Sequence, residues 1–108
     1  MQVSNEPVPK IEPDAPIHEA VCENGMTAMK AWSAALRQLK ADMPKATYDQ
    51  WVRDLMLLDA RNGTFVIGAP NDYAREWLES RLTSTIIRLL NGICDQSVDV
   101  KFVNVNEL

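Results

Sequence analysis

The sequence has little of the chemistry that catalysis or metal binding requires. Its 108 residues include one histidine, His18, and two cysteines, Cys22 and Cys94, without Cys-x-x-Cys or His-x-x-x-His spacing. This set cannot supply the ligands of a tetrahedral metal site. No glycine-rich loop precedes a helical pattern, as a phosphate site would need, and the carboxylates occur singly, mostly beside Lys or Arg. We therefore expect a protein that is not an enzyme and that binds no metal and no cofactor.

Long apolar runs and a secretion signal are missing as well. No segment approaches the roughly 18 apolar residues of a membrane span, and the first residues lack the cationic and apolar regions of a signal peptide. Cys22 lies in an acidic segment and Cys94 at the end of a helical pattern, which favours a reducing setting over a disulfide framework. These absences predict a cytoplasmic protein without membrane contact.

Positive charge is not in excess over either residues 1–27 or residues 28–108. Residues 1–27 carry Lys10 against five acids, which accounts for the whole net charge of −4, and residues 28–108 carry ten charges of each sign. A neutral body argues against strong binding to nucleic-acid phosphates, although weak or local contact stays open. Residues 1–27 also hold four of the six prolines. We predict a flexible acidic leader over 1–27 and one folded domain over 28–108.

The first half of this domain shows two helical stripes. Thr27 is a suitable cap for a helix that contains no Gly or Pro up to Met43, and Pro44 suits the first turn of a second helix. Apolar residues recur at helical spacing in both segments, which predicts a short helical hairpin. The stripes are Trp32, Leu36, Leu39 and Met43, and then Tyr48, Trp51, Val52 and Leu55.

The second half combines strand and helix signals. Asn62-Gly63 suits a tight turn with positive φ, so we predict a hairpin of strands Met56–Asp59 and Thr64–Gly68. Asn71 can cap the next helix, and the Thr-Ser-Thr stretch at 83–85 predicts a break into two helices. Alternating residues from Val98 predict a third strand, to which Val105 can belong. The order α-α-β-β-α-α-β predicts an α+β, two-layer domain with a three-stranded sheet.

The aromatic residues can be core or surface. Trp51 and Trp77 lie on full apolar stripes, and we interpret both as core. Trp32 opens a helix next to the leader, so its position is equally compatible with the core and with a half-exposed anchor. Tyr73 follows the cap Asn71, where a tyrosine either staples the first turn or forms a partly exposed binding residue.

Four groups of residues together carry a family resemblance. They are Trp32…Leu36…Leu39; Pro44-x3-Tyr48-x2-Trp51-Val52-Arg53-x-Leu55; Ala69-Pro70-Asn71-x-Tyr73-x3-Trp77-Leu78; and Val98-x-Val100-x-Phe102. With them the chain resembles the amino-terminal domain of the bacterial replication initiator DnaA from about Ala28 to Val105, about three quarters of its length. The Trp-Val-Arg and Ala-Pro-Asn elements are specific in combination, whereas either alone is weak.

The resemblance implies a non-catalytic assembly domain with a fold likened to the type II KH fold. It implies weak self-association through the first helix at Trp32, which tips our interpretation of that residue toward an interface. It also implies protein partners, namely the replicative helicase, the initiator or a regulator of initiation. The partner-binding positions that correspond to the family's are Thr47, Asn71, Tyr73 and Ala74.

Some residues depart from the family pattern. Thr47 stands where members place a carboxylate used in helicase contact, and Asp54 replaces a common proline. The ATPase and duplex-binding domains of an initiator are missing, and the 27-residue leader favours a free-standing homologue over an excised portion. An alternative function is a KH-like binder of single-stranded nucleic acid that uses Arg75, Arg81 and Lys101. An inert spacer also stays open.

Overall fold

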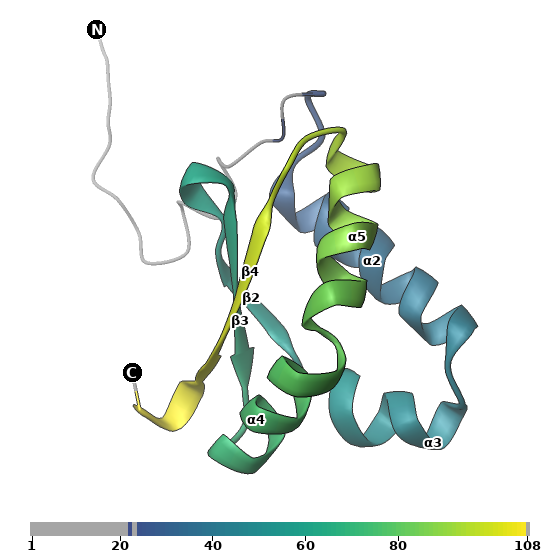
Figure 1. Ribbon diagram of the computed structural model, residues 1–108, viewed down its shortest axis with the longest axis vertical. Coiled ribbons are helices and arrows are strands. Elements are labelled where there is room, and N and C mark those ends of the chain that lie inside the picture. Colours follow the sequence, from purple (N-terminus) through teal and green to yellow (C-terminus); the bar gives the residue numbers. More distant parts are fainter. Residues whose placement is uncertain (1–21, 23, 108) are drawn as a thin grey trace, which may run out of the picture.

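A computed structural model describes residues 22 and 24–107, so most of the predicted leader lies outside the described residues. The described residues form the predicted order α-α-β-β-α-α-β (Figure 1). The helical segments are α2 (Ala28–Asp42), α3 (Lys45–Thr47) with the π-helical turn η1 (Tyr48–Val52), α4 (Asp72–Arg81) and α5 (Thr83–Cys94). The strands are β2 (Met56–Asp59), β3 (Thr64–Ala69) and β4 (Asp99–Asn104), with 3-10 turns η2 (Arg61–Gly63) and η3 (Val105–Glu107).

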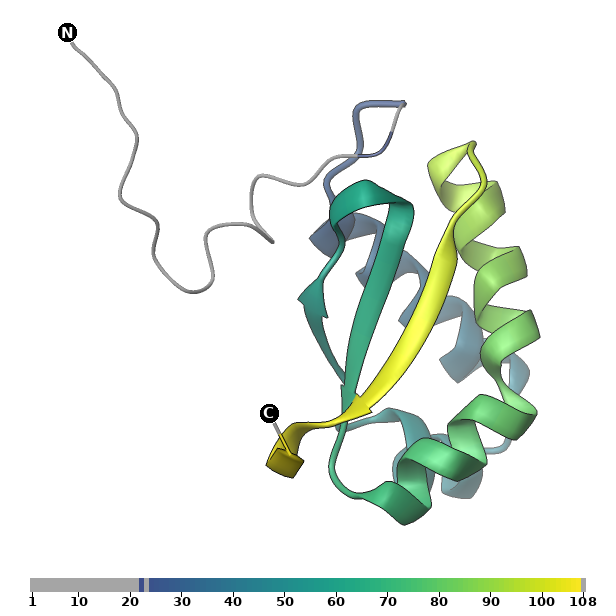
Figure 2. The same ribbon diagram turned by 60° about the vertical axis from the view of Figure 1, so that its left-hand side comes forward.

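The strands form one sheet in the order β2-β3-β4. The β2–β3 pair is antiparallel and the β3–β4 pair is parallel, with Ile67 opposite Leu57 on one side and Phe102 on the other. A parallel pair needs a long crossover, which α4 and α5 supply. All three of these side chains are buried, and Figure 2 shows the helices behind one face of the sheet. The predicted α+β fold with a three-stranded sheet is confirmed.

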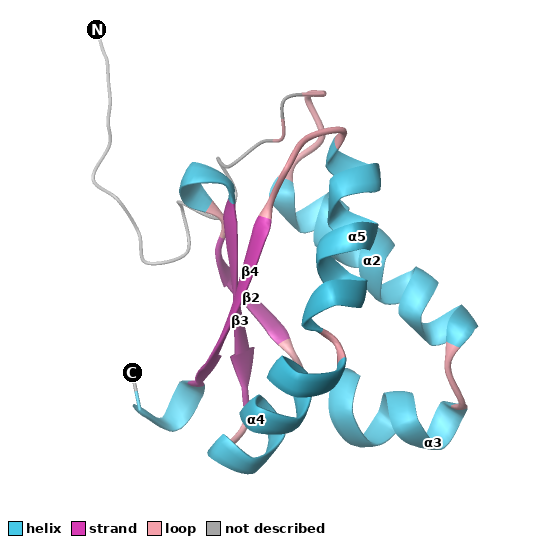
Figure 3. Cartoon of the chain, in the orientation of Figure 1, coloured by secondary structure: helices cyan, strands magenta, loops and turns pink. Residues whose placement is uncertain are grey.

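Local signals place the element boundaries close to the predicted ones (Figure 3). The Thr27 hydroxyl accepts a hydrogen bond from the Lys30 N–H at 3.2 Å and caps α2. Asn62 and Gly63 have φ of 58° and 77°, the left-handed conformation expected of this turn. Leu82 separates α4 from α5, as the Thr-Ser-Thr stretch predicted. Val105 begins η3 instead of extending the third strand.

The second helix departs from a regular α-helix. After Pro44 and the short α3, the chain widens into η1, where the Arg53 N–H donates to the Tyr48 carbonyl five residues earlier at 2.9 Å. A π-helical turn rotates its residues away from the positions that a 3.6-residue period predicts. Val52 is fully buried, whereas Trp51 is only partly buried at the border of the core.

The burial of the three tryptophans therefore differs from the predicted pattern. Trp32 is 3% exposed and lies in the core, so the interpretation of a half-exposed anchor is wrong. The start of α2 is covered because Cys22 and Met26, which precede it, pack onto the same core. The described residues before Thr27 thus contribute to the core. Trp51 and Trp77 pack against the core but are only partly buried, so the interpretation of both as core side chains holds in part.

Replacing Trp32 should test this assignment directly. Trp32→Ala removes a buried indole and should lower the free energy of unfolding by about 3–5 kcal/mol, measured by urea denaturation. The control Met29→Ala changes a 40% exposed side chain on the same helix and should stay within about 0.5 kcal/mol of the parent chain. Equal stabilities of the two variants would contradict the core assignment.

Candidate functional site

Three aromatic residues meet where η1 lies against α4. We call Trp51, Tyr73 and Trp77 the aromatic cluster. The Trp51 and Trp77 rings stack with centroids 4.3 Å apart and planes only 4° from parallel. The Tyr73 ring lies 5.5 Å from the Trp51 ring at an angle of 55°. The Arg81 guanidinium lies 5.7 Å from the Trp77 ring centroid, within cation–π distance. The cluster thus joins two segments that are distant in sequence.

Tyr73 is the most exposed large hydrophobic residue of the described chain. Its exposed fraction is 71%, compared with 52% for Met56 and 40% for Met29. Of the two alternatives for Tyr73, this exposure fits the exposed residue beside the helix cap better than a staple of the first turn. A tyrosine in this position offers a partner both an apolar ring and a hydroxyl that can form a hydrogen bond.

Asn71 fixes the backbone from which Tyr73 projects. Its side-chain oxygen accepts a hydrogen bond from the Ala74 N–H at 2.8 Å, so Asn71 is the N-cap of α4, as predicted. Asn71 itself is exposed. Ala74 is 6% exposed, so its side chain offers a partner almost no surface, and the interpretation of Ala74 as a direct contact is revised. Its contribution is the backbone N–H that completes the cap.

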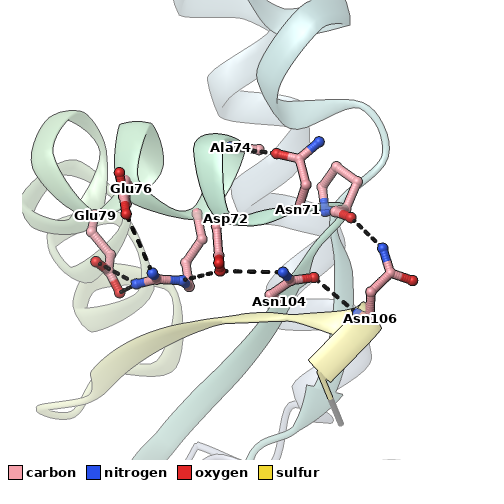
Figure 4. A network of polar contacts seen from close by, with 9 residues as sticks. Asn71, Asp72, Ala74, Glu76, Glu79, Asn104 and Asn106 are labelled. Carbon is pink, nitrogen blue, oxygen red and sulfur yellow. Dashed lines mark hydrogen bonds and ion pairs between the residues drawn. The ribbon is translucent and has the colours of Figure 1, made fainter.

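Hydrogen bonds from β4 and η3 also hold the start of α4 (Figure 4). The Asn104 amide donates to the Asp72 carboxylate at 3.2 Å, and the Asn106 amide donates to the Pro70 carbonyl at 2.8 Å. The Asn104 hydrogen bond, followed by that of Arg75, holds the pKa of Asp72 below its usual value. A lowered carboxyl pKa means that this stabilisation is complete above about pH 4 and is lost as the pH falls through the folded-state pKa.

Thr47 occupies the end of α3, directly before η1, and is partly buried. Figure 1 shows α3 and α4 at the same end of the molecule. One turn of helix separates Thr47 from Trp51, whose ring touches Tyr73. The ring contact between Trp51 and Tyr73 therefore joins the segment that carries Thr47 to the start of α4, which carries Asn71 and Tyr73. Sequence reasoning missed Trp51 and Trp77 as parts of the candidate site, because a regular helical period puts both in the core.

Comparisons with known proteins identify the family of the chain. Residues 29–92 match the family model described as the DnaA N-terminal domain. The chain belongs to this family. The chromosomal replication initiator protein DnaA of Roseiflexus castenholzii is 38% identical over 78 residues, which are 72% of this chain. They are only 16% of that relative, so the chain spans about one sixth of its length.

Arg75 of this DnaA N-terminal domain is surrounded by acids. Its guanidinium lies 3.1 Å from Glu79, 3.3 Å from Asp72 and 3.7 Å from Glu76. Hydrogen bonds to Glu79, and then to Asp72, raise the pKa of Arg75. A cation with three carboxylates around it has much of its charge compensated, which weighs against the predicted role of Arg75 in nucleic-acid binding.

Two other features, a metal site and a membrane-spanning helix, are absent from the described residues. Residues 22 and 24–107 contain no group of three or more His, Cys, Asp or Glu side chains placed to hold a metal ion. Within the same residues, no helix combines the length and the apolar character needed to cross a membrane.

The cap can be tested by two variants of Asn71. Asn71→Ala removes the acceptor for the Ala74 N–H and should lower the free energy of unfolding by about 1 kcal/mol in urea titration. Asn71→Asp keeps an acceptor oxygen at the helix start and should remain within a few tenths of a kcal/mol of the parent chain. If both variants lose the same stability, the side chain stabilises the helix by something other than capping.

Proposed function

We propose that this DnaA N-terminal domain is a non-catalytic, cytoplasmic interaction module that docks a replication or regulatory protein with Tyr73 as the anchor. The observation that carries the proposal is that Tyr73 is 71% exposed although its ring rests on Trp51. Exposed aromatic side chains on a rigid base are typical of residues that contribute most of the energy of a protein interface. We also propose that the topology corresponds to the type II KH fold that the family resemblance implies.

The surroundings of Tyr73 favour binding because little has to be ordered when a partner arrives. Its backbone is held by the Asn71 cap, and its ring is supported on one side by Trp51. Binding costs less entropy when the contacting side chain is already in place. The π-helical turn beneath it, which carries Trp51, also belongs to a class of distortion that is frequent at functional sites.

The replicative helicase is the first partner to test, followed by the initiator itself and a regulator of initiation. This order comes from the family resemblance, with Thr47, Asn71 and Tyr73 at the contact. Thr47 carries no charge, and the neighbouring charges Lys45 and Asp49 pair with each other at 2.6 Å. We therefore expect the contact to rest on aromatic and hydrogen-bonding groups more than on ion pairs.

Weak self-association is a second part of the proposal. Because Trp32 is buried, we propose that it acts by supporting α2 and that exposed residues of α2 touch the second copy. Met29 is 40% exposed and lies beside Lys30 and Arg37 in a shallow groove on this helix. A weak interface needs only a small surface of this kind.

Single-stranded nucleic-acid binding fits the contacts less well. Base stacking needs free aromatic faces, and in this cluster only the exposed Tyr73 ring offers one, because Trp51 and Trp77 stack on each other and Arg81 lies over Trp77. Arg75 is engaged by three carboxylates. Protein docking uses the same surface without disturbing these contacts.

The proposal is tested by truncating Tyr73 in the full chain. Tyr73→Ala should leave the circular dichroism spectrum and urea midpoint nearly unchanged, because the side chain is mostly exposed. It should weaken binding of the purified helicase at least about 30-fold in a titration, since such anchors are worth about 2 kcal/mol or more.

Two control variants make the result specific. Tyr73→Phe keeps the ring and should retain most of the affinity, whereas Met29→Ala changes an exposed apolar side chain at the other end of the domain and should have no effect. Unfolding of Tyr73→Ala would show that the residue is structural. Unchanged helicase affinity in a folded Tyr73→Ala variant would contradict the proposed docking surface.

A further inference from the structure

The two cysteines, which are 72 residues apart in sequence, meet inside the domain. The sulfur atoms of Cys22 and Cys94 lie 2.6 Å from each other, and both residues belong to the buried core with exposed fractions of 6% and 0%. A disulfide has a sulfur–sulfur distance of about 2.05 Å. Only a small movement of the side chains is therefore needed to join them. The docking surface around Tyr73 does not use this pair.

The backbone around Cys22 is held in place by its own hydrogen bonds. The Cys22 N–H donates to the Met26 carbonyl at 2.7 Å, and its carbonyl accepts from the Gly25 N–H at 2.9 Å. The Asn24 amide reaches across to the Ile93 carbonyl at 3.0 Å, in the last turn of α5. The turn that carries Cys22 is thus fixed beside the residue that precedes Cys94.

The two thiols differ in their access to reagents. Cys22 lines a surface cavity together with Ala60, Arg61 and Asn62 near η2, whereas Cys94 does not line this cavity. Burial, together with the neighbouring Cys22, raises the pKa of the Cys94 thiol to about 12. Cys94 therefore remains a neutral thiol near pH 7, and a reagent from solution meets Cys22 first.

We propose that Cys22 and Cys94 form a reversible intramolecular disulfide by exchange with a low-molecular-weight disulfide. The Cys22 thiolate attacks one sulfur of that disulfide, and the bond between its two sulfurs breaks to release one thiol. Cys94 then gives up its proton and attacks the Cys22 sulfur, which releases the second thiol. Two protein thiols are oxidised, one small disulfide is reduced to two thiols, and the two protons pass to the released thiolates.

The bond would fasten the chain just before α2 to the end of α5. In the reduced protein the described contacts at this junction are hydrogen bonds and packing, including the Asn24 bond to Ile93. A cross-link between residues 72 positions apart removes much of the freedom of the unfolded chain. In a reducing compartment the pair would be a dithiol. Oxidation would convert it to a disulfide that joins the segment before α2 to the end of α5.

The test uses the unmodified full chain with oxidised glutathione or with dithiothreitol. Oxidation should lower the intact mass by about 2 Da without forming dimers, and dithiothreitol should restore it. Thiol titration in denaturant should find two thiols before oxidation and none afterwards. The melting temperature of the oxidised chain should be higher by roughly 10 °C. These comparisons use one sequence in two states, so no variant has to fold.

Cys22→Ser is the matched control. It leaves Cys94 without a partner, so oxidised glutathione should give either no reaction or a mixed disulfide, and the melting temperature should not rise. The proposal is overturned if the unmodified chain keeps two titratable thiols under oxidising conditions. It is also overturned if the chain accumulates stable mixed disulfides or dimers in place of the internal bond.

Discussion

The stacking of Trp51 on Trp77 is the contact on which the proposed site depends. It joins the π-helical turn η1 to α4, with ring centroids 4.3 Å apart, and so brings two distant segments to one surface. Such aromatic pairs contribute about 0.5–1.5 kcal/mol beyond the apolar area that they bury. Without this contact Tyr73 would lose the ring on which it rests. The stack is therefore structural support for a surface, although neither tryptophan is fully buried.

Two further hydrogen bonds hold the start of α4. Asn71 caps the helix through the Ala74 N–H, while Asn104 bonds to Asp72 at the carboxyl end of β4 (Figure 4). The exposed Tyr73 thus projects from a segment with little freedom of its own. A rigid backbone with one exposed aromatic residue is the arrangement that loses least entropy when a partner binds.

Much of the fold can be predicted from local signals in the sequence. Thr27, Asn71 and the Asn62-Gly63 turn act within a few residues, so their effect on helix and strand boundaries is visible without tertiary information. The roles of the tryptophans could not be predicted in the same way. A regular helical period places Trp51 inside, but the π-helical turn moves it to the border of the core. Trp32 belongs to a core that also includes Cys22 and Cys94, and no local pattern encodes this packing of distant segments.

The proposed partner binds at the aromatic cluster and not at the buried part of α2. The chain has three tryptophans, each with one indole N–H signal in a nitrogen-15 NMR spectrum. Titration with unlabelled helicase should shift or broaden the signals of Trp51 and Trp77 at low occupancy and leave that of Trp32 in place. A shift confined to Trp32, with Trp51 and Trp77 unchanged at saturation, would contradict the account.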